Sequence, residues 1–352
     1  MMKLTDRDWK VFRIDEIFDD ISRPISRSKN QYTSGDVPFI ASGSSLNGAV
    51  AFCTPKGDER LDDANCITVS PVDGSCFYQP TAFLGRGGGG SSIIILRSLK
   101  LNRNNGVFLA MAVNHTTSKY QYGHMATSDG IKREKILLPV NENDQPDYQF
   151  MADYECELTQ QKSKKYLNYA KNQLTKLGSA KPLKPFDELK WKPVCVNDIG
   201  DVLSGRDIYA RERIDGQLPY VTSGSTNNGI GYFVGNDNKS KDCGVISVNR
   251  NGAVGEAFYH PYTALFGNDC RKLRLGLNDK YKYAPFFVAA MVSKQKTAFS
   301  YSRKLGTNRL KQLKVMLPVD DQSQPDYDYM EQYVKNKMIQ KYNNYLRYLN
   351  TI

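Results

Sequence analysis

The chain has 352 residues, of which 40% are apolar, and it carries a formal net charge of +11 at pH 7. This length accommodates two domains with substantial cores, and the basic excess suggests a polyanionic partner, although solvated surface lysines would give the same total. No apolar run approaches the roughly 18 residues of a membrane span, and the first ten residues do not resemble a signal peptide. We therefore expect a cytoplasmic protein.

The seven cysteines are odd in number, scattered, and never spaced C-x-x-C. This pattern favours free, mostly buried thiols over a disulfide framework or a zinc site. The three histidines are likewise isolated, so the sequence offers no convincing metal cluster and no obvious nucleophile and base pair.

The first part of the chain is typical of a mixed domain of short strands. Short apolar runs at residues 37–41, 66–70 and 93–96 are broken by Gly, Asn, Asp and Pro, the pattern of strands joined by turns. Residues 106–120, and residues 284–299 later in the chain, each have the length and periodicity of one buried helix. The strand-like run ILLPV at residues 136–140 closes the domain.

A glycine-rich stretch, GRGGGG at residues 85–90, matches two nucleotide-site patterns. It fits G-x-G-x-x-G, and together with Phe83 it fits the F-x-G-x-G of methyl-donor pockets. Both patterns require a helix directly after the turn, because the helix N-terminus holds the anion. Residues 91–96 read SSIIIL instead, and their β-branched side chains favour a strand. We interpret the stretch as a loop between strands, with nucleotide binding as the less favoured alternative.

A long helix is predicted after the first domain and again at the end of the chain. Asp147 and Asp326 each follow a proline, and an acidic side chain there favours the first helical turn. Apolar residues recur every three or four positions along residues 148–177 and again from residue 334 onward. Two such stripes would bury each other in a helix pair, although each helix could instead pack only on its own domain.

The sequence contains a long internal repeat. PFIASGSSLNGAVAF at residues 38–52 and PYVTSGSTNNGIGYF at residues 219–233 share seven identities in fifteen positions, at an offset of 181. The two tryptophans, Trp9 and Trp191, open the two copies with W-K, and LPV followed by QPDY closes both. Because each copy is far longer than a solenoid repeat, we expect two homologous domains.

The repeat and the linker between its copies set the expected organisation. Gly178, Pro182 and Pro185 stop the first long helix and begin an extended linker. We expect the following parts: domain 1 at residues 1–146, the first long helix at 147–178, the linker at 179–190, domain 2 at 191–325 and the second long helix at 326–352.

This doubled plan resembles the specificity subunits of bacterial restriction-modification systems over the whole chain. The resemblance rests on the doubled W-K-x-x-x-[IV]-x-[DE]-I opening, the doubled P-[FY]-[IV]-x-S-G-S-x-x-N-G block, the turn at Gly252, and the LPV and QPDY ending. The ending and the rather short helices are most similar to the specificity subunits of type IIB, or type IIG-like, systems rather than to the longer type I subunits.

The resemblance implies an α+β fold with two homologous mixed α/β target recognition domains, each followed by a long helix. The two helices would pair as an antiparallel coiled coil with pseudo-two-fold symmetry. It also implies a non-catalytic chain that binds a bipartite double-stranded DNA target. Methyltransferase or fused nuclease-methyltransferase subunits would then be its partners, and S-adenosylmethionine and Mg²⁺ would bind to those partners rather than to this chain.

The family has no fixed signature for DNA contacts, so we predict them from charge and loop position. Arg grips phosphate or reads guanine, and Asn reads adenine. The candidate loops are residues 22–32 with their counterpart 204–213, the loop after each FYxP element, the turn before Gly252, and residues 300–311. Arg86 of the first FYxP loop aligns approximately with the second loop's GNDCRK. The predicted contacts are Arg23, Arg27, Lys29, Arg86, Arg206, Arg211, Arg213, Arg250, Asn251, Asn268, Arg271, Lys272, Arg303, Lys304 and Arg309.

Two other classes of function stay open at this point. A self-sufficient methyltransferase or nuclease is disfavoured, because the sequence has no [DN]-P-P-[YF] motif and its E-x-K at Glu188 has no convincing acidic partner. A duplicated protein-binding or glycan-binding module would use the 22 tyrosines as its surface.

Overall fold

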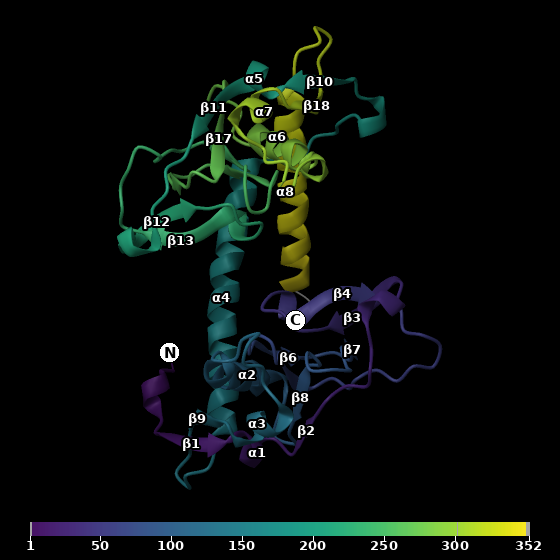
Figure 1. Ribbon diagram of the computed structural model, residues 1–352, viewed down its shortest axis with the longest axis vertical. Coiled ribbons are helices and arrows are strands. Elements are labelled where there is room, and N and C mark those ends of the chain that lie inside the picture. The colour runs from purple at the N-terminus through teal and green to yellow at the C-terminus, as the bar shows by residue number, and fades with distance from the viewer. Residues whose placement is uncertain (1, 301, 350–352) are drawn as a thin grey trace. The chain divides into compact units, whose positions relative to one another are not determined.

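The computed structural model describes residues 2–300 and 302–349 of the chain (Figure 1). It divides into two compact units, unit 1 with Met1–Tyr166 and unit 2 with Leu167–Ile352. Each unit combines short strands with a few helices, which confirms the predicted α+β class. The division falls within the long helix α4 (Tyr148–Leu177), so its first part belongs to unit 1 and its last part to unit 2.

Unit 1 contains three small sheets. The largest is antiparallel, with the strand order β2 (Asp20–Ser22), β8 (Ile94–Arg97), β5 (Cys66–Val69) and β6 (Cys76–Gln79). In the second, β3 (Ser34–Ile40) lies between β4 (Ala49–Cys53) and the parallel β7 (Leu84–Gly85). In the third, β1 (Trp9–Arg13) pairs with β9 (Lys135–Pro139), so the first and last strands of the domain lie together. Its helices are α1 (Ile14–Ile17), α2 (Arg103–Thr117) and α3 (Ser128–Arg133).

Unit 2 repeats this topology strand for strand. Its four-stranded sheet has the order β11 (Gly200–Ser204), β17 (Cys270–Leu275), β14 (Val245–Asn249) and β15 (Ala257–His260). Its three-stranded sheet has the order β13 (Ile230–Val234), β12 (Asp215–Val221) and β16 (Leu265–Phe266), and β10 (Trp191–Cys195) pairs with β18 (Lys314–Pro318). Its short helices are α5 (Val196–Ile199), α6 (Ala284–Ser293) and α7 (Thr307–Lys311). The sequence repeat is therefore a structural repeat.

The predicted buried helix of each copy is present with shifted ends. Helix α2 begins at Arg103, before the predicted start, because the Asn102 side chain accepts hydrogen bonds from the first free backbone amides. Leu109 and Val113 on its inner face are fully buried in the core of the domain. Helix α6 ends at Ser293, and the residues predicted to continue it form a separate 3₁₀ turn.

The repeated S-G-S-x-x-N-G block forms the turn that joins β3 to β4 and β12 to β13. Asn47 and Asn228 have φ values of 56° and 53°, and the glycines that follow have φ values of 76° and 72°. Asn and Gly adopt this left-handed backbone with the least strain, which explains why both residues recur in the two copies.

The two long helices begin as predicted. The side chain of Asp147 accepts a hydrogen bond from the Phe150 amide at 2.9 Å at the start of α4, and Asp326 accepts one from Tyr329 at 2.8 Å at the start of α8 (Tyr327–Leu349). Within unit 2, the ring of Tyr169 in α4 lies 6.2 Å from that of Tyr342 in α8. The last three residues of the predicted second helix, 350–352, lie outside the described residues.

Replacing Asp326 with alanine is expected to destabilise unit 2 by about 1 kcal/mol, because the first turn of α8 loses its cap. Thermal unfolding of the purified chain measures this change. Asp321→Ala is the matched control, because this side chain is fully exposed and forms only a surface ion pair with Lys190. Equal losses for the two variants would contradict the capping role.

The residues before each tryptophan also belong to the repeat. The Trp9 indole donates to the Leu4 carbonyl at 2.8 Å, and the Trp191 indole donates to the Phe186 carbonyl at 3.0 Å. The seven cysteines are free, and four of them are buried, as predicted. Among the described residues, no helix is both long and apolar enough to cross a membrane.

Candidate nucleic-acid interface

Four loops of unit 1 meet on one surface, which we call the loop face of unit 1. They are residues 42–47, 71–75, 86–92 and 120–127. Three hydrogen bonds join them, from Ser75 Oγ to the Gly43 carbonyl at 2.9 Å, from Ser42 Oγ to the Ser91 carbonyl at 3.3 Å, and from the Ala126 amide to the Pro71 carbonyl at 2.9 Å.

The equivalent loops of unit 2 meet in the same way and form its loop face. They are residues 223–228, 250–256, 267–269, and 294–300 with 302–306. The connecting contacts are from the Ala253 amide to the Ser223 carbonyl at 3.2 Å, from the Arg250 amide to the Asp269 carbonyl at 2.9 Å, and from Lys296 Nζ to Glu256 Oε1 at 2.7 Å. Because the topology repeats and two of the three connections join equivalent loops in both units, the loop face is a property of the domain rather than of one copy.

The glycine-rich loop of unit 1 lies directly on the backbone of the segment that precedes it. A Cβ atom at Gly87 would lie 1.8 Å from the Ile25 carbonyl oxygen, and one at Gly88, whose φ is 82°, would lie 2.6 Å from Ser26 Oγ. Only glycine permits this approach. The strand β8 follows the loop, as predicted, and the helix that a nucleotide site requires is absent from this described segment.

The loop register of the two units makes the approximate alignment from sequence exact. The Arg86 amide donates to the Ile40 carbonyl in unit 1, and the Gly267 amide donates to the Val221 carbonyl in unit 2, so Arg86 corresponds to Gly267. The loop of unit 1 is therefore four residues longer than its counterpart. Arg271 lies in strand β17 and not in the loop.

A polar cluster in unit 2 has unmet hydrogen-bonding capacity. Asp269 Oδ1 lies 3.5 Å from Arg250 Nε and 3.4 Å from Asn251 Nδ2, and Asn268 lies beside it in the chain. Among the described residues, Arg250 Nε and Asn251 Oδ1 are buried atoms without a hydrogen-bond partner. Since such atoms cost free energy, a neighbouring donor and acceptor suit a ligand that offers both.

Comparison with known proteins explains the doubled architecture. The model of the type I restriction modification DNA specificity domain matches residues 6–168 and 188–347, one copy in each half of the chain. The chain belongs to this family. It is therefore a DNA sequence-recognition component of a restriction-modification system, and the family is not a catalytic one. This assignment favours the specificity subunit over the two alternative classes of function.

Two kinds of relative accompany the family match. The chain is 28% identical over 337 residues to the specificity subunit S.BcgI of a type II restriction enzyme from Heyndrickxia coagulans. The alignment covers 94% of this chain and 96% of that one. A solved type I restriction-modification S subunit from M. genitalium is similar at 17% identity and a TM-score of 0.49, over 99% of this chain and 94% of that chain. The HsdS subunit from Thermoanaerobacter tengcongensis is similar at 12% identity and a TM-score of 0.32, over 96% and 91%.

Most of the predicted contact residues of the two specificity domains reach the surface. The exposed ones are Lys29, Arg206, Arg211, Arg303, Lys304 and Arg309. The half-buried ones are Arg23, Arg86, Arg213, Arg250, Asn251 and Asn268. Among the described residues, no hydrogen bond or ion pair engages the side chains of Lys29, Arg86 or Arg206, which leaves their charges available to a ligand.

Two half-buried arginines, one in each specificity domain, are held in place by contacts within their own domain. Arg23 donates to the Ser92 carbonyl and to Ser128 Oγ, both at 3.1 Å, and so connects the glycine-rich loop to α3. The Arg213 guanidinium lies 3.7 Å from the centre of the Tyr232 ring. Both arginines therefore fix the local shape of the candidate interface as well as adding charge to it.

Three predicted contacts are buried, and their positions correct the sequence-based assignment. Arg27, Arg271 and Lys272 are each no more than 5% exposed. Arg271 Nε donates to Thr307 Oγ1 at 2.7 Å, and burial, together with nearby Arg250, lowers the pKa of its guanidinium. These three groups have no open path to a phosphate or a base edge, so we assign them structural roles.

Sequence reasoning missed the loop after α2 in the first specificity domain. Tyr122 is 84% exposed on the loop face of unit 1, and the neighbouring rings of Tyr120 and His124 stack with their centres 5.6 Å apart. No charge or motif marks this segment. Only its position after a predicted helix could have suggested it.

Proposed function

We propose that each domain reads one half of a bipartite double-stranded DNA sequence with its loop face. The observation that carries this proposal is the Arg250 and Asn251 pair beside Asp269 on the loop face of unit 2, in which Arg250 Nε and Asn251 Oδ1 are buried without a hydrogen-bond partner. Arg reads guanine through two acceptors, and Asn reads adenine through one donor and one acceptor. The half-buried Asn268 is the third candidate for base contact.

The remaining accessible cations are proposed to hold the phosphate backbone. Phosphate contacts fix the register of a protein on a duplex and make its affinity depend on salt. In unit 1 these cations are Arg23, Lys29 and Arg86. In unit 2 they are Arg206, Arg211, Arg213, Arg303, Lys304 and Arg309.

We infer that a methyltransferase or a fused nuclease-methyltransferase subunit joins the chain in the cytoplasm and supplies the chemistry. The similarity to a specificity subunit of a type II restriction enzyme supports a partner that belongs to a restriction enzyme. S-adenosylmethionine and Mg²⁺ would then belong to that partner. The contact between Tyr169 and Tyr342 supports pairing of the two long helices as a coiled coil, with residues 147–178 as the spacer.

Selection of binding sequences from random duplexes, with the partner present, tests the proposed function. We expect two conserved half-sites centred about one helical turn apart, because two similar domains read one face of the duplex. A single contiguous site, or no enrichment, would contradict it. Affinity should also fall steeply with added salt.

Replacing Arg250 with alanine is expected to weaken discrimination at one half-site about 10- to 100-fold, because one bidentate base contact is worth about 1–3 kcal/mol. Binding to duplexes with single base changes in each half-site measures this. Arg250→Lys keeps the charge and should lose discrimination while keeping the salt dependence. Lys282→Ala, on an exposed position outside the loop face, is the matched control and should read both half-sites normally.

A further inference from the structure

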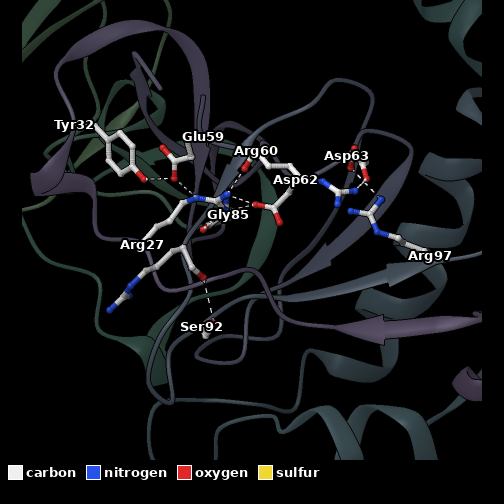
Figure 2. A network of polar contacts seen from close by, with 10 residues as sticks. Arg27, Tyr32, Glu59, Arg60, Asp62, Asp63, Gly85, Ser92 and Arg97 are labelled. Carbon is white, nitrogen blue, oxygen red and sulfur yellow. Dashed lines mark hydrogen bonds and ion pairs between the residues drawn. The ribbon is translucent and has the colours of Figure 1, made fainter. Parts of the chain in front are cut away.

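A buried cation occupies the same set of acceptors in both units. In unit 1 the Arg27 guanidinium donates to Asp62 Oδ2 and to the Arg60 carbonyl, both at 2.5 Å (Figure 2). In unit 2 Lys272 Nζ donates to Asp242 Oδ2 at 2.7 Å and to the Ser240 carbonyl at 3.1 Å. Each cation thus binds an aspartate and the carbonyl two residues before it. We call this arrangement the cation socket.

The two aspartates occupy equivalent positions in the repeated fold. Asp62 forms an isolated antiparallel bridge with Phe83, and Asp242 forms one with Ala264. The strands β7 and β16 begin directly after these bridge partners and pair with equivalent residues of β3 and β12. The socket is therefore built twice in the same place.

The cation itself comes from a different position in each unit. In unit 2, Lys272 lies opposite Ser247 in the sheet. In unit 1, Thr68 is the equivalent of Ser247, and Ile95 lies opposite it. Lys272 therefore occupies the position of Ile95. The 3₁₀ turns Lys29–Gln31 and Ala210–Glu212 share the repeat offset of 181 with β3 and β12. At that offset, Arg27 corresponds to Ile208, which is also buried. The two units have therefore exchanged an isoleucine and a cation between two positions.

We propose that the cation socket positions the recognition surface, and that Arg27 is a positioning residue for the half-site of unit 1. This inference rests on the proposed function, in which Arg23 and Lys29 of the segment 22–32 and Arg86 of the glycine-rich loop contact DNA. Arg27 lies on the segment 22–32, between Arg23 and Lys29, so its contacts hold that segment in place. Asp62 Oδ2 also accepts the Gly85 amide at 2.9 Å, directly before the glycine-rich loop. Arg27 thereby joins two DNA-facing segments at one carboxylate.

Two further contacts of this segment strengthen the connection. Glu59 Oε1 accepts from Arg27 Nε at 2.8 Å and from the Tyr32 hydroxyl at 2.7 Å, so one carboxylate holds the middle and the end of the segment (Figure 2). Among the described residues, unit 2 has no such link between its buried cation and the segment 204–213. Its cation, Lys272, belongs to strand β17 and not to that segment. Its segment 204–213 is held by other contacts, and Arg206 and Arg211 there are exposed.

Variants that move the cation from segment 22–32 to the neighbouring strand distinguish the effect of its charge from the effect of its position on the segment. In unit 1, Arg27→Ile empties the socket, and adding Ile95→Lys refills it from the strand, as Lys272 does in unit 2. Phe83→Ala makes room for the new lysine, because Ala264 occupies that position in unit 2. The full change is Arg27→Ile with Ile95→Lys and Phe83→Ala, and Arg27→Ile with Phe83→Ala is its control.

Three measurements on the full chain with its partner test the proposal: the melting temperature, amide hydrogen exchange of residues 22–32, and discrimination at each half-site. The triple variant should melt several degrees above the double variant. Its segment 22–32 should nevertheless exchange faster than in the wild type. Discrimination should fall about tenfold at the half-site of unit 1 and stay unchanged at the other.

The proposal is overturned if the triple variant reads its half-site as the wild type does, since the charge alone would then suffice. It is also overturned if the triple variant melts no higher than the double variant, since the socket would then not accept a cation from the strand. Faster exchange with undiminished discrimination would place the DNA contacts of unit 1 away from this segment, while selection of a bipartite site would still support the proposed function.

The reciprocal change in unit 2 is the matched control. Ile208→Arg with Lys272→Ile rebuilds there the arrangement of unit 1. It should melt above Lys272→Ile alone, and any change in discrimination should be confined to the half-site of unit 2. An effect on the half-site of unit 1 would contradict the assignment of one socket to each half-site.

Discussion

Replacing Lys272 with methionine is expected to destabilise unit 2 by about 3 kcal/mol, because it leaves the buried carboxylate of Asp242 with one cation fewer. The two side chains are 5% and 8% exposed, and the hydrogen bond between them is 2.7 Å long. Burial alone would raise the pKa of Asp242, but hydrogen bonds from Lys272 and Arg274 hold this pKa below its usual value. Because Arg274 remains, we expect the lower end of the range for a broken buried pair.

Thermal unfolding with hydrogen exchange of the Ile246 amide, in the central strand of the sheet, measures this loss in unit 2. Lys241→Met is the matched control, because Lys241 forms an exposed ion pair with Asp237, four residues earlier in the chain. We expect less than about 1 kcal/mol for that variant. An unchanged unfolding temperature for Lys272→Met would show that Arg274 alone neutralises Asp242.

The doubled topology could be predicted because the repeat reports on backbone requirements. Asn47 and its counterpart Asn228 recur because both turns need a left-handed residue, and the capping aspartates recur because both long helices need an acceptor at their first turn. Strand runs such as residues 93–96 were recognisable from β-branched side chains alone. Local chemistry thus carried the architecture.

The candidate site was less predictable, because its polar contacts join residues far apart in sequence. Arg27 looks like any basic loop residue until Asp62, 35 positions later, is seen to accept its hydrogen bonds. Lys272 follows a loop in sequence but belongs to a strand. Charge and loop position therefore favoured both residues as DNA contacts, although the folded chain uses them internally.

Loop length also kept the alignment of the two loops by sequence approximate. The insertion in the glycine-rich loop of unit 1 shifts Arg86 onto Gly267, which only the repeated backbone hydrogen bonds reveal. That register is needed to see which positions correspond in the two units. Arg27 of unit 1 corresponds to Ile208 of unit 2, and Ile95 of unit 1 corresponds to Lys272 of unit 2. The comparison of the two units within one chain supplied the information that a single copy could not.

Unit 2 is expected to lose stability in mild acid through one buried histidine. His260 is fully buried, and its ring nitrogens lie 2.8 Å from Ser247 Oγ and 3.1 Å from the Tyr262 hydroxyl. Burial lowers the pKa of His260 to about 4, below the value of about 6.5 expected in the unfolded chain. Between these values the unfolded state binds a proton that the folded state does not, so stability falls as pH drops from about 6.5 toward 4.

The variant His260→Gln should remove this dependence, because Gln79 holds the equivalent position in unit 1 and bonds Thr68 Oγ1 in the same way at 2.9 Å. Between pH 7.5 and pH 5 the wild type should lose about 2 kcal/mol more than the variant, since each unit of pKa difference is worth about 1.4 kcal/mol. Denaturant unfolding of unit 2, followed by hydrogen exchange at the two pH values, measures the difference. The exposed His115→Gln is the control and should behave as the wild type does. Parallel losses for wild type and His260→Gln would mean that His260 is not the group responsible.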